Sequence, residues 1–347
     1  MLTATKSFLP RRPRGRQTDI TEAQYQTDLR RFCALILKIY SRMDFRVGVR
    51  GWCYLLEPHG LLKGDFPDAE RLITSLRKSG DLPLDICAED DSRETILLED
   101  IDPEDDPERE ADNWINWLLQ SAHTQYKPIS FWDDLNVYIE VGVEKGDLRE
   151  LFKQVCRELY VPITNFKGWY DVNCRAAMMR RFKLHEANGR QCILLLCGDH
   201  DPGGLNITDW VRENFEALAN AYCVTEGRID WTPDNLKIIR FGLNKNFIDA
   251  NNLTWIENLE TSSGKRLDDP NHNDHNKDYV QEYIRKFGAR KCEANVIVRV
   301  PEMGRQLVRD AIMKHLPAGA HNRYRARLAR IQALLQKAIK ERIGEDE

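Results

Sequence analysis

The sequence predicts an α/β domain with a four-stranded parallel sheet, preceded by a mainly α-helical region and followed by a helical extension. Strand-like and helix-like segments alternate between residues 136 and 241, which is typical of a parallel sheet covered by helices. The apolar run Gln191–Cys197 has the length and composition of a strand buried on both faces. A strongly acidic segment separates this part of the chain from about 70 residues before it.

The composition of the chain is typical of a globular protein and argues against several other classes. The chain has 347 residues, too many for one small domain, and its 42% hydrophobic and 31% charged residues are typical of a globular protein. The net charge of −4 excludes a protein that is strongly basic overall. No apolar run approaches about 18 residues and no apolar stretch follows the basic N-terminus, so we expect neither a membrane span nor a secretory signal. Nine cysteines without a C-x-x-C pair indicate free thiols in a reducing cytoplasm.

Five parts are expected along the chain: a basic arm at 1–20, a helical domain at 21–88, an acidic linker at 89–130, the sheet domain at 131–245 and a C-terminal extension at 246–347. The linker begins with Glu89–Asp112, which holds 13 acidic residues and only two basic ones. We expect a solvated, mobile spacer there rather than a DNA-mimicking or partner-binding segment.

Short helices dominate the region before the linker. Thr21–Gln24 fits a capping box, and apolar residues then recur every three or four positions, which predicts a helix. A second helix is expected over Asp68–Lys78, ended by Gly80. Between them, Val47–Leu56 begins with strand formers and ends with helix formers. Short helices joined by glycine turns predict a helix-turn-helix or winged-helix unit.

The elements expected after the linker are strands at 136–143, 162–166, 191–197 and 236–241, with helices at 147–160, 171–184 and 206–221. Two further helices are expected at 305–315 and 323–343, after a polar loop over Asp268–His275. We expect the last helix to pack on its own domain rather than to form a dimer contact.

Acidic residues follow two of the predicted strands. Asp199 and Asp201 come directly after the most apolar strand, and Glu144 follows the strand at 136–143. The carboxyl ends of parallel strands meet at one edge of a sheet, where α/β proteins bind ligands. Carboxylates there can hold Mg²⁺ for phosphodiester chemistry. The alternative is that these acids only cap helices at strand–helix turns.

Three segments, Ile139–Lys145, Phe166–Asp171 and Gly198–Leu205, resemble in order and spacing a Toprim domain. The resemblance is to the A subunit of topoisomerase VI and the related meiotic double-strand-break proteins, and especially to short relatives from mobile elements. It implies that Glu144, Asp199 and Asp201 bind Mg²⁺. Lys167–Asp171 (Lys-Gly-Trp-Tyr-Asp) stands where the family has Lys-Gly-Tyr-Pro-Asp.

The resemblance extends to the first domain, a winged helix that cleaves DNA in this family. Arg50–Tyr54 matches the family's Arg-x-x-x-Tyr pattern, with Cys53 where an aromatic residue is usual. This implies that Tyr54 is the nucleophile and that Arg50 stabilises charge on its phenolate and on the phosphorane. A phenol with a pKa of about 10 needs such help at neutral pH. Without the resemblance, Tyr54 is more simply interpreted as a core aromatic residue.

The family also implies a reaction and partners. We expect Mg²⁺-dependent cleavage of both strands of double-stranded DNA through 5′-phosphotyrosyl intermediates, by a homodimer in which each tyrosine works with the partner's acids. The expected location is the cytoplasm, with association with the nucleoid if the protein is bacterial or from a phage. The chain contains no glycine-rich phosphate loop, so a GHKL-type ATPase would be a separate subunit. Two alternatives stay open: a Toprim nuclease that hydrolyses DNA or RNA without a covalent intermediate, and a catalytically idle DNA-binding protein.

Other candidate DNA contacts are Arg11, Arg12 and Arg14 of the basic arm, together with Lys167 and His200 near the acids. The alternatives are that the arm is only a solvated tail, and that the His200 side chain points away from the two aspartates. His272 and His275 are more simply interpreted as solvated loop residues than as metal ligands. The cysteines, Cys192 and Cys197 especially, are expected to be small core residues.

Overall fold

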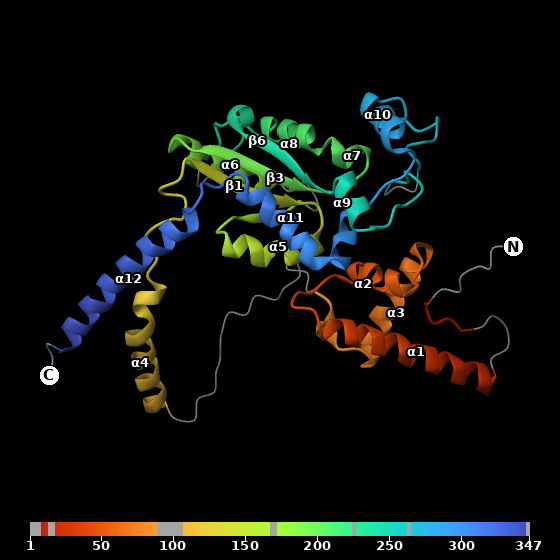
Figure 1. Cartoon of the computed structure of the whole chain (residues 1–347), viewed down its shortest axis with the longest axis horizontal. Helices are drawn as coiled ribbons and strands as arrows, with labels where there is room; N and C mark the ends of the chain where they lie inside the picture. The colour runs from red at the N-terminus through yellow and green to blue at the C-terminus, as the bar shows by residue number, and fades with distance from the viewer. Residues whose placement is uncertain are drawn as a thin grey trace.

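The computed structural model describes residues 8–12, 18–88, 107–166, 172–223, 227–261 and 265–344. It is a mixed α/β protein with one four-stranded parallel sheet, and helices make up most of the rest (Figure 1). The predicted combination of a parallel α/β part with mainly helical parts on either side of it is therefore confirmed.

The sheet contains β1 (Val137–Val143), β2 (Ile163–Asn165), β3 (Gln191–Cys197) and β6 (Lys237–Gly242), in the order β2-β1-β3-β6. All four strands are parallel, and each lies within two residues of its predicted position. The central strands β1 and β3 are buried along almost their whole length, which explains why their sequences read as continuous apolar runs. A small antiparallel ribbon, β4 (Tyr222–Cys223) with β5 (Gly227–Arg228), lies outside this sheet.

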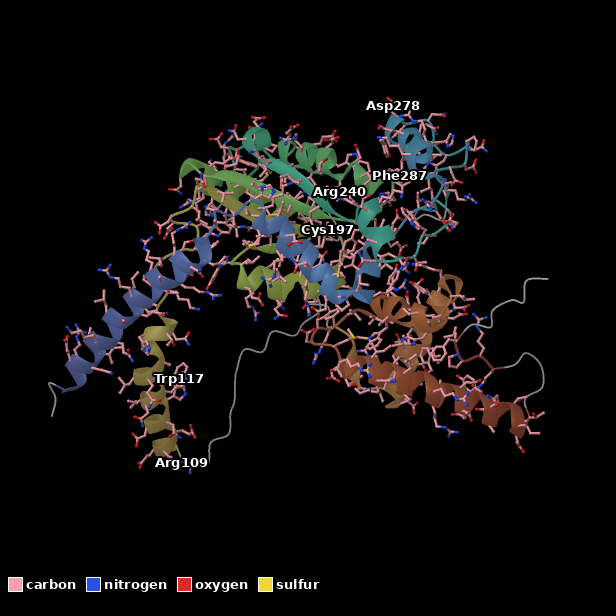
Figure 2. All side chains as sticks on the ribbon, viewed as in Figure 1. Arg109, Trp117, Cys197, Arg240, Asp278 and Phe287 are labelled. Carbon is pink, nitrogen blue, oxygen red and sulfur yellow. The ribbon has the colours of Figure 1, made fainter. Side chains whose placement is uncertain are left out.

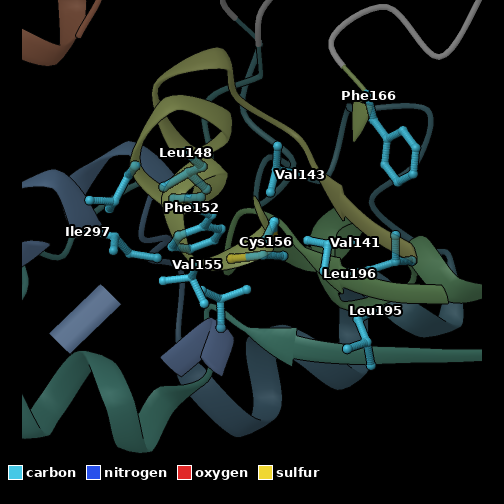
Figure 3. Packing of buried hydrophobic residues seen from close by; sticks show 14 of the residues in the cluster. Val141, Val143, Leu148, Phe152, Val155, Cys156, Phe166, Leu195, Leu196 and Ile297 are labelled. Carbon is cyan, nitrogen blue, oxygen red and sulfur yellow. The ribbon is translucent and has the colours of Figure 1, made fainter. Parts of the chain in front are cut away.

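Helices cover both faces of the sheet. Helices α5 (Gly146–Glu158) and α11 (Pro301–Met313) lie on one face, and α6 (Val172–Ala187) and α8 (Ile207–Glu216) lie on the other (Figure 1). Figure 3 shows the core between α5 and the sheet, where Phe152, Val155 and Cys156 lie among the buried side chains of β1 and β3. The single helix predicted at 206–221 was wrong in extent, because a short α7 (Pro202–Leu205) precedes α8 and α8 ends at Glu216.

The N-terminal region contains α1 (Asp19–Tyr40), α2 (Val49–Leu56) and α3 (Phe66–Ser79). The capping box was placed wrongly, because Thr18 caps α1 and Thr21 is the residue that bonds back to it. The ambiguous segment Val47–Leu56 is helical from Val49 onward, and strand pairing within 18–88 is limited to one bridge between Val47 and Cys87.

The N-terminal region packs against the sheet domain at the start of α5. The backbone N–H of Gly48, the residue before α2, donates to Asp147 Oδ1 at 2.5 Å. A Cβ atom on Gly51 would lie 2.8 Å from Asp147 Oδ2, so glycine permits this close approach. Helix α2 also contacts the 3₁₀ helix η6 (Ala294–Arg299) from the C-terminal extension. Helix α2, the start of α5 and η6, which are distant in sequence, therefore lie close together in the fold.

The remaining helices are α4 (Pro107–Gln125), α9 (Lys245–Ala250), α10 (Asp278–Phe287) and α12 (Ala320–Gly344). Residues 107–125 were predicted to be linker but form α4, and residues 89–106 lie outside the described ranges. Helices α4 and α12 project away from the sheet (Figure 1). We expected α12 to pack on its own domain, but only its first residues, such as Ala320 and Tyr324, are buried. Within the described ranges, no helix combines the length and apolar character needed to cross a membrane.

Candidate active site

The pairing of β1 with β3 brings two of the predicted acids together. Val143 is in register with Cys197, so Glu144 and Asp199 both lie just past the carboxyl ends of neighbouring strands. The backbone N–H of Asp199 donates to Glu144 Oε2 at 2.9 Å. Lys145 Nζ lies 3.0 Å from Glu144 Oε1 and 3.0 Å from Asp199 Oδ2. The two carboxylates therefore converge on one cationic group.

Burial sets the electrostatics of this cluster. Burial alone would lower the pKa of Lys145, but the neighbouring carboxylates of Asp199 and Glu144 raise it above its ordinary value. Asp201 is partly buried, and burial followed by repulsion from Asp199 raises its pKa to about 6. Asp201 Oδ1 also accepts a 2.5 Å hydrogen bond from the backbone N–H of Gly204 and caps α7, so the helix-capping role is present at this position.

Arg240 on β6 fixes the loop that carries both aspartates. Its guanidinium donates to the carbonyls of Gly198 at 3.1 Å, Asp199 at 2.7 Å and Gly204 at 2.8 Å. Figure 2 shows Arg240 and Cys197 on neighbouring strands of the sheet. Burial lowers the pKa of Arg240, but the guanidinium has several donors for these carbonyls, and it also donates to the carbonyl of Leu243. Sequence reasoning missed Arg240, which looks like an ordinary residue of an edge strand.

Tyr54 and Arg50 lie one turn apart on α2, and both reach the same carboxylate. The Tyr54 side chain is fully buried, with 0% exposure, and its hydroxyl donates to Glu293 Oε2. Arg50 lies 3.2 Å from the same oxygen and 3.3 Å from Glu70 Oε1. Lys63 Nζ lies 4.3 Å from the centre of the Tyr54 ring. Arg50 is therefore linked to the phenol through Glu293, and Lys63 lies over the face of its ring.

A short segment, Cys292–Ala294, joins the tyrosine to the acids. Glu293 binds Tyr54 and Arg50, and the next backbone N–H, that of Ala294, donates to Asp199 Oδ1 at 2.7 Å. We call this segment the connecting segment. The contact of Glu293 with Tyr54 could not be predicted from the sequence. Glu293 lies 239 residues from Tyr54, in a stretch without a periodic pattern. The tyrosine and the acids of one chain thus form one continuous polar cluster.

His200 is bound to the connecting segment by backbone hydrogen bonds. Its backbone pairs with Cys292, and its ring is buried among Trp255, Tyr283 and Phe287. Its Nδ1 lies 2.9 Å from the Tyr283 hydroxyl oxygen, and burial lowers its pKa to about 4. A neutral, enclosed imidazole is poorly placed to meet a phosphate, so this contact would require the aromatic cluster to open.

The remaining candidates are dispersed. Arg11 pairs with Asp65 and Asp68, Arg12 pairs with Glu22, and both guanidiniums are about half exposed. Arg14 and Lys167–Asp171 lie outside the described ranges. Cys192 and Cys197 are core residues, as predicted. His272 and His275 take part in turn hydrogen bonds within their own loop.

The side chains at the sheet edge can be compared with the ligands that a metal ion needs. Among the described residues, no three or more His, Cys, Asp or Glu side chains are grouped as a ready metal cluster. Glu144 and Asp199 nevertheless share the Lys145 ammonium, which shows that both oxygens already face a common cation position. Carboxylate oxygens are the donors that Mg²⁺ prefers.

Comparison of the chain with models of known protein families, with curated proteins and with solved structures finds no match. The interpretation of this site therefore depends on its own residues.

The aspartate loop depends on a glycine. A Cβ atom on Gly204 would lie 1.9 Å from the carbonyl oxygen of Asp199, a backbone atom held by Arg240. We expect Gly204→Ala to lower the free energy of unfolding by about 1–3 kcal/mol, measured by urea denaturation. The control is Gly64→Ala, where a Cβ atom meets nothing within 4 Å. Equal stability of the two variants would contradict the described loop.

Asp201 should make stability depend on pH. Its pKa is about 6 in the folded chain and 3.8 as an ordinary carboxyl, so the folded state favours the protonated form. Its contribution is fully favourable below pH 3.8 and is lost as pH rises through about 6. Asp201→Asn keeps the acceptor for Gly204 without the charge, so we expect it to stabilise the chain at pH 7.5, by on the order of 2 kcal/mol, and much less at pH 4. Urea denaturation in EDTA measures both values, and a gain independent of pH would contradict this account.

Proposed function

We propose that this protein cleaves double-stranded DNA by an Mg²⁺-dependent transesterification, in the manner of the A subunit of topoisomerase VI. In this proposal, residues 21–88 act as the winged-helix part and residues 131–245 as the Toprim part. The observation that carries the proposal is the connecting segment, which places Tyr54 and Arg50 in one polar cluster with Asp199. A nucleophile, a guanidinium and carboxylates on one cluster are the groups that phosphoryl transfer needs.

Glu144, Asp199 and, once deprotonated, Asp201 would hold the metal, with Lys145 moving aside from the position between the first two carboxylates. A bound Mg²⁺ supplies positive charge that orients the phosphate and stabilises the leaving oxygen. The raised pKa of Asp201 fits this role, because a nearby cation favours its charged form.

The chain's own residues account for the rest of the reaction. The Tyr54 oxygen forms a bond to phosphorus while the bond from phosphorus to the 3′ oxygen breaks, which leaves a 5′-phosphotyrosyl bond and a 3′ hydroxyl. Glu293 accepts the phenolic proton, since it already accepts the Tyr54 hydrogen bond, and the 3′ oxygen takes a proton from water. Arg50 balances the negative charge that develops on the phosphorane.

Two nucleophiles are needed to cut both strands, so the proposal includes a homodimer. A separate ATPase subunit of GHKL type would couple cleavage to strand passage. Arg11, Arg12, Arg14 and Lys167 remain proposed phosphate contacts.

One observation favours a second function, a Toprim nuclease that uses activated water. The Tyr54 ring is fully buried and packs edge-on against Phe66 at 5.1 Å between ring centres. A buried phenol cannot reach a phosphate until the cluster opens, whereas a water at the sheet edge needs no such movement.

Cleavage of supercoiled plasmid separates the two functions. We expect Tyr54→Phe to cut at least about 100-fold more slowly than the unaltered chain, because no other group replaces the nucleophile. Glu144→Gln should lose activity to a similar extent, and the unaltered chain should be inactive in EDTA. Tyr126→Phe is the matched control, because its side chain is 47% exposed outside the cluster.

The outcomes are distinct. Unaltered cleavage by Tyr54→Phe with loss in Glu144→Gln supports the hydrolytic nuclease. Unaltered cleavage by both variants, or in EDTA, would contradict both functions, and no cleavage by any form would also contradict both. If Tyr54 works with the acids of its own chain, as the cluster favours, a mixture of Tyr54→Phe and Glu144→Gln chains should recover no activity. Partial recovery would indicate that each tyrosine works with the partner's acids.

A further inference from the structure

Helix α4 carries an apolar face that the rest of the described chain leaves exposed. Five large side chains on it are 40–55% exposed: Trp114, Ile115, Trp117, Leu118 and Leu119. Their spacing places most of them along one side of the helix. Figure 2 shows Trp117 on α4, apart from the sheet domain. Neighbouring exposed apolar side chains of this size are typical of an interaction site.

Helix α12 presents a matching stripe. Leu328, Ile331, Leu335 and Ile339 recur at intervals of three and four, yet none of them is fully buried, and Leu334 is 63% exposed. The two helices touch close to the body of the protein, where Gln332 Nε2 donates to the carbonyls of Thr124 at 3.0 Å and Tyr126 at 3.3 Å. Beyond this contact they diverge (Figure 1). Each helix therefore leaves part of its stripe for another occupant.

The charges of the two helices indicate which occupant. Helix α12 contains seven basic residues and one acidic residue, Glu341, whereas the first turns of α4 carry Glu108, Glu110 and Asp112 with one arginine. Among the described residues, the ion pairs of α12 are Arg327 with Asp134 and Lys337 with Glu341, and neither joins α12 to the acidic turns of α4. The α4 of one chain is thus complementary in charge and apolar pattern to the α12 of another.

We propose that two copies of this chain associate through their α4–α12 helix pairs, with α4 of each copy packed against α12 of the other. A two-fold axis makes this contact twice, since the same surface serves both copies. The arrangement covers both stripes and sets acidic turns against basic ones, which favours the correct pairing. The inference is argued from the exposed helices alone and assigns a surface to the homodimer that the proposed function includes. A dimer that uses another surface would overturn this inference without contradicting the proposed DNA cleavage.

Sedimentation velocity of the full chain, from about 1 to 100 μM, tests this association. We expect a dimer for the unaltered chain. Trp114→Lys combined with Leu118→Lys should raise the dissociation constant at least about tenfold, because both side chains lie on the exposed face. Leu184→Lys is the control: this leucine is 60% exposed on α6, and its change should leave the dimer intact. Thermal unfolding checks that each variant is folded.

Charge reversal then identifies contacts between chains. One variant carries Glu108→Lys, Glu110→Lys and Asp112→Lys, and the other carries Arg330→Glu and Lys340→Glu. Each variant alone should dimerise more weakly, and an equimolar mixture should recover dimers, because each mixed dimer contains only complementary contacts. A monomeric unaltered chain, a dimer insensitive to the apolar variant, or a mixture that recovers nothing would each overturn the proposal.

Discussion

The hydrogen bond between the Asp199 N–H and the Glu144 carboxylate is the interaction on which the rest of the site depends. It forms because β1 and β3 are parallel, adjacent and in a register that pairs Val143 with Cys197. A shift of one residue would reverse the faces of every side chain in the strand and separate these groups. The apolar strands therefore do more than build the core, because their pairing fixes the relative position of two charged groups at the sheet edge.

The surrounding structure holds this edge in place from two directions. Arg240 binds three carbonyls of the aspartate loop from within the sheet, and Ala294 donates to Asp199 from the C-terminal extension. The same extension supplies Glu293 to the tyrosine on α2. Burying so many charged groups costs free energy unless each has a partner. In this cluster Lys145 and Arg50 therefore pair with carboxylates, and Arg240 binds backbone carbonyls.

Much of the fold could be predicted from the sequence, and less of the site. The central strands β1 and β3 are predictable because buried parallel strands have short apolar sequences. Glu144 and Asp199 are predicted to lie together because the ends of parallel strands meet at one edge. Lys145, Arg240 and Glu293 were missed because their roles arise from contacts between segments distant in sequence. Helix α4 was assigned to the linker because its acidic first turns continue the charge of the preceding segment.

The central claim is that Tyr54 and the acids of the sheet edge act in one reaction, and the mass of the Tyr54 peptide tests it most directly. The chain would react with DNA and Mg²⁺, be denatured, and be digested with nuclease and then protease before mass spectrometry. The account predicts a Tyr54 peptide whose mass is increased by a nucleotide attached through its 5′ phosphate. This modified peptide should be absent when the Glu144→Gln variant is used. Cleaved DNA together with an unmodified Tyr54 peptide would contradict it.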